Sequence, residues 1–156
     1  MTPRVGLGFD IHPFSDDADR RLILGGVVLP GPGLVGHSDA DAVAHAVTDA
    51  LLGAAGLGDI GTRFPDDDPA YADVDSIDLL SRVVLMVSGR WEIGNVDVSV
   101  VLEAPKLAPH REAMERRLGE VVGAPVSVKA KRAEALGALG RREGIACFAV
   151  ARLMPR

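Results

Sequence analysis

The sequence contains one cysteine, few aromatic residues and no long apolar run, and each shortage excludes a class of protein. Cys147 has no partner for an intrachain disulfide, and its apolar neighbours predict a small buried side chain. Aromatic residues make up 4% of the 156 residues, too few for the stacking platforms that bind single-stranded nucleic acid. No apolar run approaches the roughly 20 residues of a membrane-spanning helix, and the polar start of the sequence leads us to expect no signal peptide. We therefore expect a cytoplasmic protein with no nucleic-acid or membrane partner.

Aspartate is abundant, but almost all of it lies in the first half of the chain. Residues 1–78 contain fourteen Asp, no Glu and four Arg, whereas residues 79–156 contain one Asp, seven Glu and thirteen Lys or Arg. The two halves therefore carry formal charges of −10 and +5. Short aspartate side chains favour turns, caps and metal ligation. The split predicts a metal in one half and a phosphate-bearing ligand near the other.

Hydrophobic periodicity predicts both strands and helices in one domain over residues 1–156. Strands are expected over residues 5–12, 96–102, 126–131 and 144–154, with a hairpin over residues 21–30. Helices are expected from Ser38, as N-cap, to Gly56, over residues 76–88 and over residues 109–122, with a loop over residues 59–71. This order predicts an α+β two-layer sandwich. Its mixed four-stranded sheet would have the last strand inside it, helices on one face and a small added hairpin.

The first strand carries the most informative pattern. Its apolar residues, from Val5 to Ile11, are expected to face the core, and the opposite face holds two glycines followed by Asp10 and His12. On the first helix, Asp41, His45 and Asp49 recur at intervals of four. Two imidazoles and a carboxylate can hold zinc with one position open, and Asp41 or Asp49 could orient the imidazoles. The spacing alone leaves open a turn at Asp10 and a helix stripe that faces solvent.

Other candidate residues concern anions and sugars. His37 lies just before a predicted helix start, where free N–H groups favour phosphate. Four acids between Asp59 and Asp68 could accept hydrogen bonds from sugar hydroxyls or simply cap turns. The basic residues of the second half allow either phosphate binding or a solvated surface: Lys106, Lys129, Lys131, Arg132, Arg141 and Arg142.

Nine short motifs, in order over nearly the whole chain, together resemble the 2-C-methyl-D-erythritol 2,4-cyclodiphosphate synthase family of the non-mevalonate isoprenoid pathway. They are Gly8-Phe-Asp-Ile-His12, Gly25-Gly26, residues 37–45, residues 48–53, residues 56–61, Phe64-Pro-Asp66, Gly94-Asn-Val-Asp97, Ala104-Pro-Lys106 and residues 141–146. The resemblance implies a homotrimer with interfacial active sites. In these, an intramolecular phosphate attack on a cytidine diphosphate substrate releases CMP.

The resemblance also implies site residues. Asp10, His12 and His45 match zinc ligands, and Glu134 matches the residue associated with a second divalent ion, Mg²⁺ or Mn²⁺. His37 and Arg132 are the expected catalytic residues. The expected substrate contacts are Asp10, His12, His37, Ser38, Asp59, Gly61, Phe64, Asp66, Asp68, Ala104, Pro105, Lys106, Leu107, Ala108, Lys131, Arg132, Glu134 and Arg141.

The sequence departs from the family pattern near its basic residues. The usual Thr-Thr-Thr-Glu run is Lys131-Arg-Ala-Glu134 here, so Arg132 stands where a threonine usually steadies the transferring phosphate. A guanidinium can bind phosphate bidentately and replace it. Arg141 and Phe9 match a central cavity that holds an isoprenoid diphosphate in relatives, but Ala138 replaces a frequent Phe there and weakens that expectation. Two alternatives to the cyclising lyase are a metal-dependent phosphohydrolase and a weakened trimer that only binds isoprenoid diphosphates.

Overall fold

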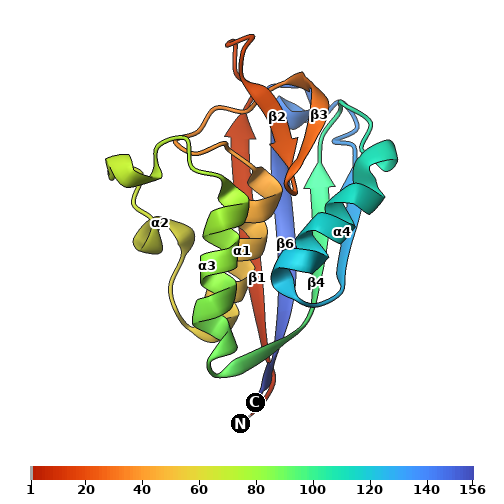
Figure 1. Ribbon diagram of the computed structural model, residues 1–156. Coiled ribbons are helices and arrows are strands. Elements are labelled where there is room, and N and C mark those ends of the chain that lie inside the picture. The colour runs from red at the N-terminus through yellow and green to blue at the C-terminus, as the bar shows by residue number, and fades with distance from the viewer. Residues whose placement is uncertain (1) are drawn as a thin grey trace.

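The computed structural model describes residues 2–156, and four of its strands form one mixed sheet in the order β1-β6-β4-β5 (Figure 1). These strands are β1 (Arg4–Pro13), β4 (Trp91–Val101), β5 (Val126–Lys131) and β6 (Gly144–Pro155). β6 pairs antiparallel with both β1 and β4, while β4 pairs parallel with β5. The expected mixed sheet with the last strand inside it is confirmed, and β1 and β5 are its two edges.

Three helices cover one face of this sheet (Figure 1). They are α1 (Ala42–Ala55), α3 (Ser76–Ser88) and α4 (Arg111–Val122). The strands β2 (Arg21–Leu24) and β3 (Val27–Pro32) form a separate two-stranded hairpin at one end. The predicted α+β arrangement, with helices on one face and a small hairpin, is therefore confirmed. Within residues 2–156, no helix is both long and apolar enough to span a bilayer.

The core lies between the sheet and the three helices, and β6 shows how the sequence builds it. Alternate residues of β6 point toward the helices and have no exposed surface: Ile145, Cys147, Ala149, Ala151 and Leu153. The three residues in the middle of this row, Cys147, Ala149 and Ala151, are small and let α1 lie close to the strand. Cys147 is a buried core residue as expected, and burial raises the pKa of its thiol well above the usual value.

The two faces of β1 are the reverse of the prediction. Its glycines, not its apolar residues, face the helix layer. A Cβ on Gly6 would lie 1.9 Å from the carbonyl oxygen of Ala50, and one on Gly8 would lie 1.8 Å from that of Ala46. The absence of side chains lets α1 pack directly on the strand. The apolar residues are instead exposed on the opposite face, with exposed fractions of 69% at Val5 and 67% at Leu7.

The start of α1 also differs from the prediction. The helix begins after Asp41, not Ser38, and the Asp41 carboxylate accepts a hydrogen bond from Ala44 N at 3.0 Å. The same carboxylate accepts from the backbone N–H groups of Gly25 at 2.8 Å and Gly26 at 2.7 Å. Asp41 thus joins the hairpin turn to the helix N-terminus. Its burial raises the pKa of its carboxyl to about 6.

The segment expected to be a plain loop between residues 59 and 71 contains two short helices. These are α2 (Ile60–Arg63) and a 3₁₀ helix at Pro69–Tyr71. Asp59 caps the first by accepting from Thr62 N at 2.7 Å, and Asp68 caps the second by accepting from Ala70 N at 2.9 Å. Two other short helices, at Ala108–His110 and α5 (Gly137–Gly140), precede α4 and β6. As a result α4 begins at Arg111 and not at Pro109.

Candidate metal centre

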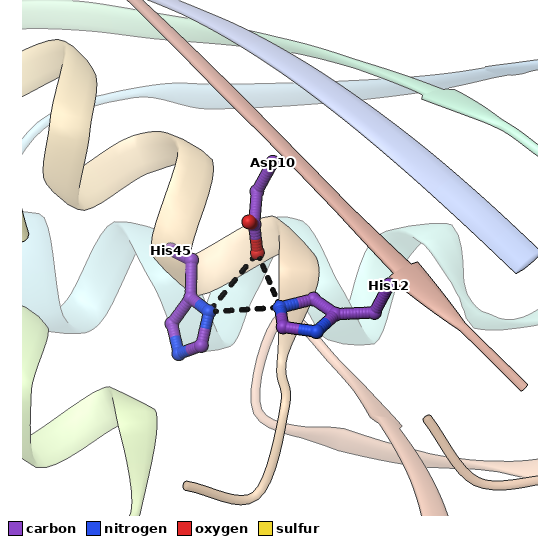
Figure 2. A group of neighbouring side chains, drawn as sticks. All are labelled: Asp10, His12 and His45. Atoms are coloured by element: carbon purple, nitrogen blue, oxygen red, sulfur yellow. Dashed lines mark hydrogen bonds and ion pairs between the residues drawn. The ribbon is translucent and has the colours of Figure 1, made fainter. Parts of the chain in front are cut away.

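Asp10, His12 and His45 meet where β1 passes the first turn of α1 (Figure 2). Asp10 Oδ2 lies 2.8 Å from His12 Nε2 and 3.0 Å from His45 Nδ1. The two imidazole nitrogens are 3.4 Å apart. Asp10 and His12 share the glycine face of β1, so both point toward α1. The structure therefore brings together the three residues that the sequence proposed as metal ligands.

Burial and hydrogen bonding oppose each other in the pKa values of this cluster. Burial alone would raise the pKa of Asp10, but hydrogen bonds from His12 and His45 outweigh it and hold that pKa below the usual 3.8. Burial alone would lower the pKa of His12, but its hydrogen bond to Asp10 raises that pKa above 6.5. Without a metal, the cluster therefore favours an ionised carboxylate beside a charged imidazole.

The remaining ring nitrogens are fixed by groups outside the cluster. His12 Nδ1 lies 2.7 Å from the carbonyl oxygen of Val35, an acceptor that requires a proton on Nδ1. His45 Nε2 lies 2.8 Å from Ser76 Oγ, and that hydroxyl donates its own proton to Asp39. Ser76 therefore accepts from His45. In the neutral rings, the unprotonated nitrogens are then those that point into the cluster, as metal ligation requires.

The residues that orient these imidazoles differ from those predicted. Asp41 contacts backbone N–H groups only, as described above, and Asp49 accepts from Ile60 N at 2.7 Å. Neither carboxylate is bonded to a histidine. At His45 the orienting group is Ser76, which lies 31 positions away in the sequence and is itself held by Asp39. The sequence identified Ser76 only as a helix start, and nothing in its local pattern indicated that its hydroxyl turns toward His45.

A cavity of about 210 Å³ opens beside the cluster, and several predicted site residues line it. Besides the three candidate ligands, the predicted residues in its wall are His37, Ser38, Gly61, Phe64 and Asp66. The ring of His37 also contacts the backbone carbonyl oxygen of Asp68 at 3.2 Å. Tyr71 belongs to the wall as well and packs edge-on against Phe64, although no pattern in the sequence predicted it as a site residue.

The basic candidates line a different cavity of about 180 Å³ near the end of β5. The predicted residues in its wall are Pro105, Lys106, Leu107, Ala108, Lys131 and Arg132. Ala104 lies in the wall of a third cavity together with Pro105. Because β1 and β5 are opposite edges of the sheet, the two groups of candidates do not share a cavity within one chain (Figure 1).

Asp59 and Asp68 line neither cavity and instead cap the two short helices described above. Two further predicted residues, Glu134 and Arg141, also stand outside both cavities. Glu134 follows β5 with a positive φ of 54°, and it does not belong to the potential metal cluster found among residues 2–156. Arg141 forms an ion pair with Glu143 at 3.0 Å. Neither residue therefore contributes to the candidate metal centre of its own chain.

Comparison with known proteins shows to which family this chain belongs. A model of the YgbB family matches residues 3–154. The chain belongs to the YgbB family. It is 54% identical over 152 residues to the 2-C-methyl-D-erythritol 2,4-cyclodiphosphate synthase of Rubrobacter xylanophilus. The aligned region covers 94% of this chain and 92% of that protein.

Solved structures agree with this membership of the YgbB family. The bifunctional IspDF of Campylobacter jejuni superposes with a TM-score of 0.94 and 38% identity, over 99% of this chain and 43% of that longer chain. A CDP complex of Plasmodium falciparum IspF superposes with a TM-score of 0.86 and 34% identity, over 99% of this chain and 97% of that one. The sheet and helix arrangement described above is thus that of known YgbB relatives.

Proposed function

We propose that this chain converts 4-diphosphocytidyl-2-C-methyl-D-erythritol 2-phosphate into 2-C-methyl-D-erythritol 2,4-cyclodiphosphate and CMP. The observation that carries the proposal is the convergence of Asp10, His12 and His45 on a cavity in a chain of the YgbB family. Relatives at 50% and 54% identity over nearly their full length bear the name of this synthase. A structural relative has been solved as a CDP complex, which supports a substrate that contains a cytidine nucleotide.

The reaction needs positioning more than a protein nucleophile. An oxygen of the 2-phosphate attacks the β-phosphorus of the diphosphate, and the bond from that phosphorus to the oxygen of CMP breaks. The attacking phosphate is already a nucleophile, so no serine or cysteine has to supply one. The chain's contribution is therefore to hold the two phosphates in line and to stabilise the negative charge between them.

The donor set of the cluster fits zinc. Asp10, His12 and His45 offer one carboxylate oxygen and two imidazole nitrogens, a set that leaves a position open for a further ligand. An ion bound there would supply Lewis-acid polarisation of a phosphate oxygen. Glu134 offers the hard oxygen ligand that Mg²⁺ or Mn²⁺ prefers, and we assign the second divalent ion to it.

The other assignments follow the family resemblance, and apart from Asp59 and Ala104 the residues line the two cavities. His37, Ser38 and Asp66 would contact the erythritol portion and its phosphate, and Asp59 with Gly61 would contact the ribose. Residues 104–108 would hold the cytosine and its phosphates. Lys131 and Arg132 would bind phosphate oxygens, with the Arg132 guanidinium as a planar fork in place of the usual threonine hydroxyl.

A homotrimer would bring the two cavities together. The face of the sheet away from the helices is apolar and exposed, with exposed fractions of 47% at Phe9, 51% at Ile11 and 42% at Phe148. An apolar patch of this kind is typical of a protein interface. If subunits pack around that face, the β1 edge of one chain can approach the β5 edge of its neighbour. An isoprenoid diphosphate near Phe9 and Arg141 in the centre of such a trimer stays a prediction.

The direct test supplies the cytidine diphosphate substrate with zinc and magnesium and follows the phosphorus NMR spectrum. We expect equal amounts of cyclodiphosphate and CMP, and neither from a His45→Ala variant. Release of CMP without cyclodiphosphate would contradict the proposal and favour a phosphohydrolase. No turnover by correctly folded, zinc-loaded wild type would favour a binding protein.

A further inference from the structure

The segment between the hairpin and α1, residues 34–38, has every backbone carbonyl oxygen engaged, and the partners alternate. The carbonyl oxygens of residues 34, 36 and 38 all accept from the side chain of Arg20. Those of residues 35 and 37 accept instead from His12 Nδ1 at 2.7 Å and from Asp73 N at 2.9 Å. The chain bends at residues 36–38, which lets three alternate carbonyls converge on one guanidinium. Arg20 therefore binds three of the five carbonyls, while His12 of the metal cluster binds one of the other two.

The guanidinium of Arg20 makes these contacts as a fork. Its Nε donates to Leu34 O, and one Nη2 donates to Gly36 O at 3.1 Å and to Ser38 O at 2.6 Å. The side chain is half-buried, and no carboxylate of residues 2–156 forms an ion pair with it. Its donors are thus committed to three carbonyl groups spread over five residues. A lysine ammonium, which donates from one point, cannot span them.

The backbone around Arg20 is fitted to the same segment. A Cβ on Gly33 would lie 2.5 Å from the carbonyl oxygen of Arg20, so the chain just before the segment touches Arg20 directly. Ser15 N donates to Gly33 O at 2.7 Å, and Val35 N donates to Pro13 O at 2.9 Å. These bonds set where the segment runs, and the Arg20 side chain sets which way its carbonyls turn.

We propose that Arg20 is a positioning residue of the metal centre. By holding the carbonyls of residues 34, 36 and 38, it aims the Val35 carbonyl at His12 Nδ1 and places the Ser38 hydroxyl 3.1 Å from His45 Nε2. The first contact fixes the tautomer of His12 that leaves Nε2 free for a metal. The inference rests on the proposed metal site, but its test measures zinc affinity and the tautomer of His12 and does not depend on enzyme activity.

The experiment compares Arg20→Gln with Arg21→Gln, since Arg21 is an exposed neighbour with no side-chain hydrogen bond found among residues 2–156. Zinc affinity is measured by competition with a chromophoric chelator. We expect Arg20→Gln to bind zinc about 10- to 100-fold more weakly, the usual effect of losing a group that orients a ligand. Arg21→Gln should match wild type within about twofold. Equal affinity of folded Arg20→Gln and wild type would overturn the proposal.

The ring nitrogen NMR shifts of His12 in metal-free protein separate positioning from a merely structural role. Above the pKa of His12, wild type should show the tautomer with the proton on Nδ1, and Arg20→Gln should show a mixture. A variant that loses thermal stability but keeps the wild-type tautomer would contradict the proposal. If Arg20→Gln does not fold, Arg20→Lys decides. It keeps the charge without the fork, and zinc affinity equal to wild type would overturn the role of the fork.

Discussion

The two edges of the sheet carry the two halves of the proposed site, and they are built differently. At the β1 edge, Asp10, His12 and His45 are mostly buried, and Asp10 Oδ2 and all four imidazole nitrogens have partners. At the β5 edge, Lys106, Lys131 and Arg132 are exposed, and none forms an ion pair with another of residues 2–156. The first half is thus assembled by one chain alone, while the cationic side chains of the second half are exposed and unpaired within residues 2–156.

This contrast explains why the metal half is preorganised and the anion half is not. A metal site requires ligand atoms within a few ångströms and the correct tautomers, which only a packed interior provides. Phosphate binding tolerates flexible cations, which order when the anion arrives.

The largest expected effect comes from removing a ligand at the preorganised edge. His45→Ala should leave less than one tenth of the wild-type zinc per chain and lower kcat by about 10³-fold or more, since a Lewis acid contributes several kcal/mol. Metal analysis and the cyclisation assay check both. His110→Ala is the matched control, because His110 lies at the start of α4 with no side-chain cap bond. A full equivalent of zinc in His45→Ala would refute the assignment.

The second prediction tests whether the two edges that form one site belong to different chains. His12→Ala and Glu134→Ala are each expected to be inactive, but under the proposed homotrimer, mixed trimers would contain interfaces with both halves intact. After subunit exchange in equal amounts, roughly a quarter of the wild-type activity should return, because each half is intact with even odds.

A mixture of His12→Ala and His45→Ala chains provides the control for that experiment. Both substitutions lie in the β1 half, so no interface regains a complete site and activity should stay absent. Recovery in both mixtures, or in neither after exchange has been verified, would contradict a site shared between chains.

The third prediction concerns Arg132 at the exposed edge. If its guanidinium steadies the transferring phosphate, Arg132→Ala should lower kcat by roughly 10²-fold, the usual loss for one preorganised donor. Arg132→Lys should recover part of this, because it keeps the charge without the planar fork. Arg132→Thr should be milder than alanine. Wild-type turnover by all three variants would remove Arg132 from the catalytic residues.

The sequence predicted elements better than it predicted which surfaces meet. The alternation in residues 5–12 correctly indicated a strand, but it assigned the apolar face to the core. Periodicity shows which residues share a face and cannot show which face a helix covers. Glycines at 6 and 8 were the available signal, since they allow the close approach of α1.

The candidate site was predictable to a similar extent. The spacing of Asp10 and His12 placed them on one face, and the residue types suggested a zinc site with His45. Spacing alone left a solvent-facing helix stripe open, and the family resemblance favoured the metal site. Ser76, Arg20 and the Val35 carbonyl were not predicted, because they act through contacts over 14 to 31 positions of sequence. Such contacts depend on tertiary packing and leave no local pattern.

The smallest expected effect is a pH dependence confined to the β1 edge. The raised pKa of His12 means that its ion pair with Asp10 stabilises metal-free protein fully below pH 6.5, and this stabilisation is lost as pH rises through the raised value. The lowered pKa of Asp10 means that its contribution is present above pH 3.8 and is lost as pH falls further. The pair therefore stabilises metal-free protein most between these limits.

Zinc should show the opposite trend, because it needs the neutral imidazole that the ion pair disfavours. Below the pKa of His12, zinc affinity should fall by about tenfold per pH unit as the proton competes for Nε2. Thermal unfolding between pH 5 and pH 8, with and without zinc, measures both trends at once. The unfolding temperature of metal-free protein should fall as pH rises past the pKa of His12, while the increase caused by zinc should grow. Lys106→Met, which changes only the exposed edge, should leave that increase and its pH dependence unaltered. A zinc effect that stays constant across this range would mean that no proton leaves His12 when metal binds, and the cluster would then not be the zinc site.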